Sequence, residues 1–104
     1  MKTYFVIEYS YSIQHDIDYY ENYSGYEEVY AYEAEDAIHE VEQQIGQCLN
    51  LKTVAYSNKN AEKIKLKYDL PQIKKLLETG SIQNQEQQQI LKKWIAHSEK
   101  IINS

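Results

Sequence analysis

The side chains that could do chemistry in this chain are carboxylates and phenols, and both concentrate in its first half. Residues 3–51 contain eleven Asp and Glu residues and no lysine, and the chain has no arginine. With the single Lys2, residues 1–51 carry a net charge of −10, whereas ten lysines and five acids give residues 52–104 a net charge of +5. Nine of the eleven tyrosines lie within residues 4–32. This segregation predicts a dipolar surface whose acidic part is rich in tyrosine.

Catalytic signatures are missing from this pattern. General acid–base catalysis needs a carboxyl group that is desolvated in a pocket, and an all-acid, polar distribution does not predict one. The three glycines, Gly25, Gly46 and Gly80, are scattered, so there is no phosphate-binding loop. Neither a nucleophile elbow nor a zinc-protease motif is present. We therefore expect a protein that is not an enzyme and that needs no cofactor.

Metal ligation and nucleophilic chemistry have weak candidates. His15, Asp16 and Asp18 form one His/Asp cluster, for which we favour a solvated loop. Glu35, His39 and Glu42 would share one edge of a helix, where a surface stripe is the better interpretation. Cys48 falls on the predicted apolar stripe of the same helix and is expected to be a small buried residue. No metal site is predicted.

The acids and tyrosines together suggest a surface that binds a basic partner. Carboxylates spaced over a sheet edge and an adjoining helix can imitate a row of phosphates, and tyrosine rings can stack on arginine side chains. The alternatives are an acidic face that only confers solubility and rings that merely cover the sheet. The predicted partner-binding residues are Tyr19, Tyr20, Tyr23, Glu27, Glu28, Tyr30, Glu33, Glu35, Asp36 and Glu40.

The elements that would position these residues follow from hydrophobic periodicity. Alternation predicts strands over residues 4–13, 26–33, 51–57 and 63–68, the last an edge strand with three outward lysines. Residues 14–25 are predicted to form a long hairpin loop and residues 57–60 a turn. Helical spacing predicts helices over 33–48, over 69–80 with Asp69 as cap and Pro71 in the first turn, and over 84–102.

This element order, β-β-α-β-β-α-α, predicts an α+β fold. We expect an antiparallel sheet of about four strands with the helices packed on one face. At 104 residues the chain is predicted to be a single domain, residues 1–104.

Two other kinds of function compete with the acidic docking surface. Lys63, Lys65 and Lys67 on one strand could contact nucleic acid, but the absence of arginine and the net charge of −5 disfavour direct binding. A structural or assembly subunit could instead associate through the last helix, with Trp94 as anchor, including as a homodimer.

The location and broad type of the protein are expectations from composition. No apolar run is long enough for a membrane span, the N-terminus lacks a secretory apolar region, and one cysteine cannot form an internal disulfide. We expect a cytoplasmic protein, in the host cytoplasm if phage-encoded. In size, acidity and lack of a catalytic signature the chain resembles the small inhibitors that phages and mobile elements direct against bacterial defence, including anti-CRISPR proteins. That resemblance implies an inhibitor. The interval without basic residues and the tyrosines among its acids predict that this inhibitor docks on a basic, nucleic-acid-binding surface and imitates nucleic acid.

Overall fold

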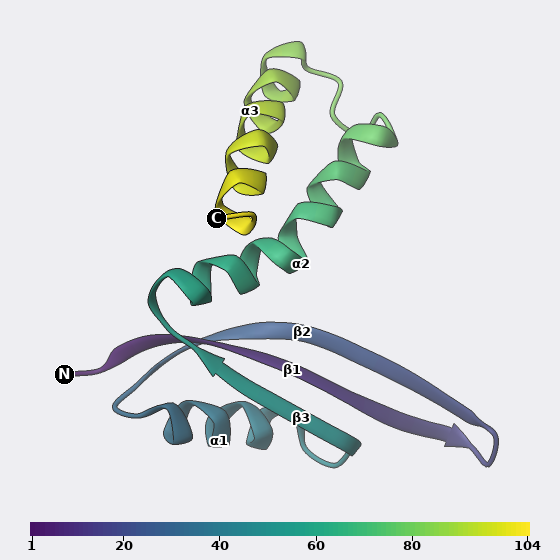
Figure 1. Cartoon of the computed structure of the whole chain (residues 1–104). Coiled ribbons are helices and arrows are strands. Elements are labelled where there is room, and N and C mark those ends of the chain that lie inside the picture. Colours follow the sequence, from purple (N-terminus) through teal and green to yellow (C-terminus); the bar gives the residue numbers. More distant parts are fainter. The chain divides into compact units, whose positions relative to one another are not determined.

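The computed structural model describes residues 1–104 as three strands and three helices (Figure 1). The elements are β1 (Thr3–Asp16), β2 (Tyr19–Ala31), α1 (Ala34–Ile45), β3 (Leu49–Tyr56), α2 (Asn58–Glu78) and α3 (Gln85–Ile102). The strands form one antiparallel sheet in the order β2-β1-β3. The α+β class and the antiparallel sheet are confirmed, but the predicted fourth strand and the predicted element order are wrong.

The β1–β2 hairpin is much longer than predicted. Its two strands pair from Thr3 with Ala31 to Asp16 with Tyr19, so that only Ile17 and Asp18 form the turn. The Asp16 side chain accepts the Ile17 N–H at 2.7 Å. The prediction of a loop over 14–25 is therefore wrong. Polar residues alternate with tyrosines in this stretch because the two strands extend beyond the end of β3 as a solvent-exposed ribbon.

The core of the sheet lies between α1 and one sheet face. Ile7 of β1 and Val29 of the adjacent strand β2 pack with Ala37 and Val41 of α1, and all four are buried. The spacing of Ala37 and Val41 places both on one side of the helix, as predicted. Gly46 ends α1 at a φ of 75°, a left-handed conformation that glycine adopts easily. Cys48 thus lies after the helix, in the connection to β3, and not on its stripe as predicted.

The opposite sheet face is covered at one end. Val6 points away from α1, because it adjoins Ile7 in the strand, and yet it is fully buried. Ala61, in the first turns of α2, is buried as well. α1 is the helix that contacts all three strands, and the packing of the other helices on one sheet face stays a prediction.

Residues 57–80 differ most from the prediction. Residues 58–78 form the single helix α2, so the predicted turn over 57–60, the strand over 63–68 and the separate helix capped by Asp69 are all wrong. Leu66, Leu70, Ile73 and Leu77 follow helical spacing, and lysine and leucine are good helix formers. Pro71 lies inside the helix and not in a first turn. Because helix residues two apart point in different directions, Lys63, Lys65 and Lys67 do not form the lysine face of a strand that the nucleic-acid hypothesis required.

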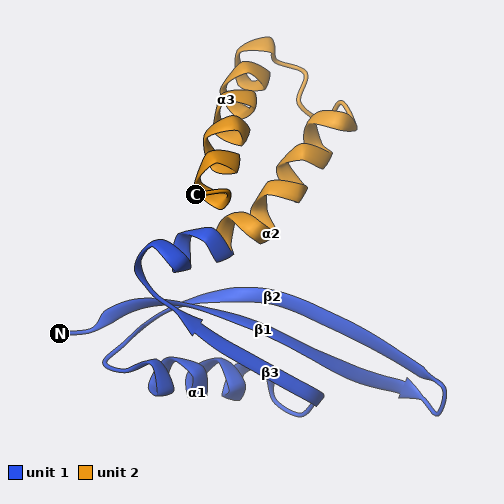
Figure 2. Cartoon of the chain, in the orientation of Figure 1, with its two compact units in different colours: residues 1–64 blue, residues 65–104 orange.

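The chain divides into two compact units, residues 1–64 and residues 65–104 (Figure 2). In the second unit, α2 and α3 are joined by a salt bridge of 2.7 Å between Lys74 Nζ and Glu99 Oε1. Both side chains are nearly half exposed, so this pair adds little stability. The single-domain assignment stays a prediction. None of the helices combines the length and the apolar character that a membrane span requires.

The cap of α3 gives a direct stability prediction. Asn84 Oδ1 accepts the N–H groups of Glu86 at 2.8 Å and Gln87 at 3.2 Å, where the helix was predicted to begin. Asn84→Ala removes this cap and should lower the free energy of unfolding by about 1 kcal/mol. Urea unfolding followed by Trp94 fluorescence measures the change. Asn84→Asp keeps the acceptor and should unfold like the parent, and equal losses in both variants would contradict the capping role.

Candidate functional site

Three tyrosines stack side by side on the α1 face of the hairpin. Tyr11 of β1 lies between Tyr9 of the same strand and Tyr23 of β2, its direct cross-strand partner. The ring centroids are 5.9 Å apart for Tyr9 and Tyr11 and 5.3 Å apart for Tyr11 and Tyr23, with interplanar angles of 24° and 22°. We call Tyr9, Tyr11 and Tyr23 the tyrosine row. It continues the α1 side of the sheet towards the hairpin turn.

Gly25 allows the first ring of the row to lie across β2. It pairs with Tyr9, and a Cβ atom added at Gly25 would lie 2.9 Å from the Tyr9 hydroxyl and 3.2 Å from Cζ. A side chain at this position would therefore displace the ring. The Gly25 position fixes where the Tyr9 ring lies, beside Glu27 on the same face.

A carboxylate organises the end of the hairpin. Glu21 accepts hydrogen bonds from the hydroxyls of Tyr23 and Tyr19, the latter at 3.2 Å, and its Oε1 lies 3.5 Å from His15 Nε2. The His15 and Tyr19 rings are 5.5 Å apart. The Tyr23 hydrogen bond, with a smaller contribution from Tyr19, lowers the pKa of Glu21. The same hydrogen bonds raise the pKa values of Tyr19 and Tyr23.

These shifts predict a pH response of the hairpin end. The pKa of Glu21 is lower in the folded than in the unfolded protein. Glu21 therefore stabilises the fold at pH values above its unfolded-state pKa, and this stabilisation is lost as pH falls through its folded-state pKa. The pKa values of Tyr19 and Tyr23 are raised in the folded protein, so the two phenols stabilise the fold until pH rises through these folded-state pKa values. Glu21→Gln should return both phenol pKa values towards 10, as measured by NMR titration of labelled tyrosine rings. Unchanged titration of both rings would contradict the assigned hydrogen bonds.

A hollow of about 270 Å³ lies between the tyrosine row and α1. Its lining side chains come from both strands of the hairpin and from the second half of the helix: Tyr9, Tyr11, Glu27, Val41, Gln44 and Ile45. Partial burial raises the pKa of Tyr9, and the negative charge of Glu27 adds to this effect, with a smaller contribution from Tyr11. The hollow thus combines two phenol rings, one exposed carboxylate, one amide and an apolar floor.

Four of the predicted acids lie at the start and along the exposed side of α1. Glu33 precedes the helix as its N-cap residue, and Glu35 and Asp36 lie in its first turn. Their negative charges interact favourably with the positive end of the helix dipole. Glu40 lies one turn before Gln44 of the hollow. All four side chains are exposed, and no lysine forms a salt bridge with any of them.

The remaining predicted residues divide between the two sheet faces. Tyr19, Tyr23 and Glu27 share the α1 face, whereas Tyr20, Glu28 and Tyr30 alternate with them and point to the other face. The Tyr30 ring contacts the Tyr4 ring there, with centroids 5.3 Å apart and the ring planes tilted by 51°. Tyr19, Tyr20, Tyr23 and Tyr30 are between 39% and 65% exposed. The predicted residues therefore do not form one continuous surface.

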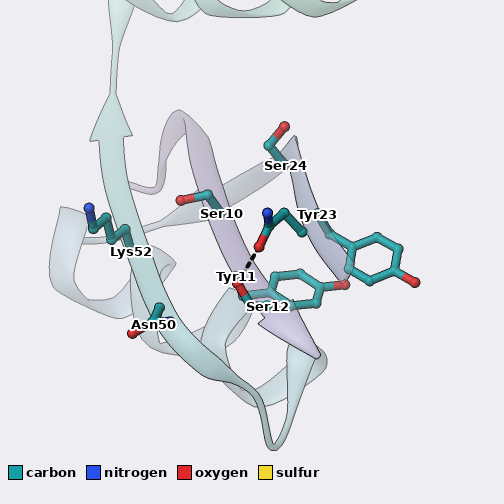
Figure 3. Close-up of a pocket in the computed structure, with 8 residues that line it drawn as sticks. Ser10, Tyr11, Ser12, Tyr23, Ser24, Asn50 and Lys52 are labelled. Carbon is teal, nitrogen blue, oxygen red and sulfur yellow. Dashed lines mark hydrogen bonds between the residues drawn. The ribbon is translucent and has the colours of Figure 1, made fainter. Parts of the chain in front are cut away.

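The other face also carries a shallow polar hollow, shown in Figure 3. Small side chains of β1 and β2 form its floor, and the Ser12 hydroxyl donates to Asn22 Oδ1 at 2.5 Å. Lys52 and Asn50 of β3 line one side. Figure 3 also shows the neighbouring rings of Tyr11 and Tyr23. Its only charged lining residue is a lysine, so this hollow does not suit a basic partner.

The histidines and the cysteine lie apart from one another. No group of three or more His, Cys, Asp or Glu side chains could hold a metal ion. His39 Nε2 lies 3.0 Å from the Gln43 amide, His15 contacts Glu21, and Cys48 is a half-buried free thiol.

Sequence reasoning missed Tyr9, Tyr11 and Glu21 as parts of this surface. The signal was the alternation Tyr19, Glu21, Tyr23, Gly25, Glu27, which has strand period throughout. Ser24-Gly25 resembles the end of a loop, and that interpretation hid the pattern. In the structure Gly25 lies inside β2, and the Tyr9 ring occupies the space that a side chain at Gly25 would need.

Comparison with known proteins adds no family to this description. No family model, curated protein or solved structure matches the chain.

Proposed function

We propose that this protein is a non-enzymatic inhibitor that docks through its acidic first unit on a basic, nucleic-acid-binding surface of another protein. In this proposal the protein belongs to the anti-defence inhibitors that phages and mobile elements encode. Its carboxylates bind the partner where the phosphates of nucleic acid would otherwise bind. The observation that carries it is that the acids at the start and along the exposed side of α1 have no lysine partner, while the tyrosine row lies on the sheet face that α1 covers.

The charge of the first unit supports this proposal. Residues 1–64 contain twelve acids and four lysines, a net charge of −8, whereas residues 65–104 contain seven lysines and four acids. The negative charge is thus held within one compact unit. Close like charges cost folding free energy, and complementary potentials accelerate the encounter with a basic partner.

The aromatic side chains support a protein partner. Tyrosine offers a large contact area with few rotatable bonds and is enriched at protein interfaces. The row presents stacked rings with limited freedom, so little conformational entropy is lost when a partner covers them. The proposed binding surface is therefore the α1 face of the first unit. The negative charge of this surface comes from Glu27, Glu33, Glu35, Asp36 and Glu40.

Affinity purification from the native host tests the proposal. The full chain serves as bait at low and high salt, and co-eluting proteins are identified by mass spectrometry. A partner of the expected kind handles nucleic acid, is released by high salt, and loses its nucleic acid when the purified protein is added in a competition assay. A salt-insensitive partner, or one that keeps its nucleic acid, would overturn the proposal.

Self-assembly through the second unit is the other candidate. Residues 65–104 contain only two buried apolar residues, Leu66 and Leu70, while Leu76 and Ile90 are 41% and 65% exposed. Small units with so little core often gain stability by association. Trp94, the predicted anchor, is half-buried. Sedimentation of the parent and of Ile90→Ser, an exposed position that should not affect folding, distinguishes a dimer from a monomer.

A further inference from the structure

We infer that the hollow between the tyrosine row and α1 binds the side chain of a single arginine presented by a partner protein. This inference rests on the proposed function and makes it more specific, because it names the residue of the partner and the place where it binds. The hollow is formed entirely within residues 1–64, by β1, β2 and α1.

The lining groups match a guanidinium and its aliphatic stem. Glu27 supplies a carboxylate that can accept two parallel N–H bonds, and the Gln44 amide oxygen adds a further acceptor. The Tyr9 ring, at the end of the row, has a stacking partner on one side only and can offer its other face for cation–π contact, whereas the Tyr11 ring between Tyr9 and Tyr23 lines the hollow with its edge. Val41 and Ile45 provide an apolar wall for the methylene groups of the stem.

The same groups disfavour other ligands. No lysine or histidine lines the hollow, so an anion would meet only the negative charge of Glu27 and the electron-rich rings. A lysine ammonium is more strongly hydrated than a guanidinium and lacks the planar shape that stacks on a ring. A neutral side chain would leave the carboxylate without a charged partner. Arginine is therefore the side chain that uses all four kinds of lining group.

The hollow is also preorganised. The Tyr9 ring is held over Gly25, where an added Cβ would lie 2.9 Å from its hydroxyl, and the Tyr11 ring is held between Tyr9 and Tyr23. Glu27 is exposed, and no hydrogen bond or salt bridge within the chain occupies its carboxylate. An incoming guanidinium thus has no internal cation to displace.

An NMR titration of the full chain tests this inference with three small probes. These are the N-acetyl amides of arginine, lysine and citrulline, the last being a neutral molecule of nearly the same shape as arginine. We expect the arginine probe to shift the signals of the Tyr9 and Tyr11 rings and of the Gln44 side chain, with millimolar affinity. Citrulline should cause no saturable shift, and lysine should bind at least threefold more weakly.

Two variants locate the site. Glu27→Gln should weaken arginine binding at least fivefold, whereas Glu42→Gln, with the same change in net charge on an exposed side chain of α1, should have no effect. Gly25→Ala should displace the Tyr9 ring and weaken binding while Glu27 is kept. Equal binding of arginine and citrulline, or binding that Glu27→Gln leaves unchanged, would overturn the inference.

The two proposals can fail separately. A salt-sensitive, nucleic-acid-handling partner recovered together with no arginine binding would leave the proposed function standing and reject the hollow as its site. Arginine binding at the hollow, with a partner that keeps its nucleic acid, would establish the site and reject the inhibitor.

Discussion

Ile7→Ala should lower the free energy of unfolding of the first unit by about 3 kcal/mol, which is a large part of the stability of a small domain. Ile7 is fully inaccessible to solvent and packs with Val29, Ala31, Ala37 and Val41 between the sheet and α1. Truncation removes apolar burial and leaves a cavity that the sheet cannot close, because Ile7 lies on the central strand β1. We therefore expect extensive loss of the α1–sheet core.

Urea unfolding with two spectroscopic probes measures this effect. Ten of the eleven tyrosines lie in residues 1–64 and the single tryptophan, Trp94, lies in residues 65–104, so near-UV tyrosine signals and tryptophan fluorescence report on different units. Ile17→Ala is the matched control, because Ile17 is 81% exposed in the hairpin turn, and it should change stability by less than about 0.5 kcal/mol. Similar losses in both variants would contradict the assigned core. Coincident tyrosine and tryptophan transitions in the parent would support the predicted single domain.

Neutralising Glu35, Asp36 and Glu40 together, as Glu35→Gln, Asp36→Asn and Glu40→Gln, should slow association with the basic partner on the order of tenfold at low salt. The three side chains are exposed and form no salt bridge with lysine, so their charge is available for steering. The difference between the variant and the parent should shrink as salt is added, because screening weakens the steering of the parent. Stopped-flow or surface-plasmon measurements over a salt series give both quantities.

A second triple variant separates local charge from net charge. Glu62→Gln, Glu78→Gln and Glu86→Gln remove the same charge from three exposed acids outside residues 1–51. This variant should associate nearly as fast as the parent. If the two triple variants slow association equally, net charge alone matters and the acids of α1 have no specific role.

The parts of the fold that sequence predicted well have a periodic pattern and a clear end signal. The helix α1 follows from Ala37, Val41 and the acids before them, and α3 follows from Asn84 and the apolar stripe after it. The strand β3 begins two residues before the predicted start, a small difference at a strand end. In each of these elements local preference and tertiary packing agree.

The errors arose where local pattern and the structure diverge. Lys63 to Tyr68 alternates with strand period, but the residues after it continue with helical spacing, and the whole run forms α2. Ser24 and Gly25 have turn composition, but Tyr9 packs on the glycine from the neighbouring strand. A long-range contact of this kind leaves no local signal. The sequence therefore identifies the acids of the candidate surface together with Tyr19 and Tyr23. The strand register of the structure was needed to identify Tyr9, Tyr11 and Glu21.

One of the two outer strands of the sheet, β2, has a consequence for handling the protein. β2 pairs only with β1, so one side of a thirteen-residue strand keeps unpaired backbone groups, and the strand contains no lysine or proline to block pairing with another molecule. Glu21, Glu27 and Glu28 are its only charged side chains, and their negative charges repel a second copy. Concentrated stocks should therefore stay clear in low-salt buffer and form fibrils as salt is added, because screening weakens the repulsion between neighbouring edges.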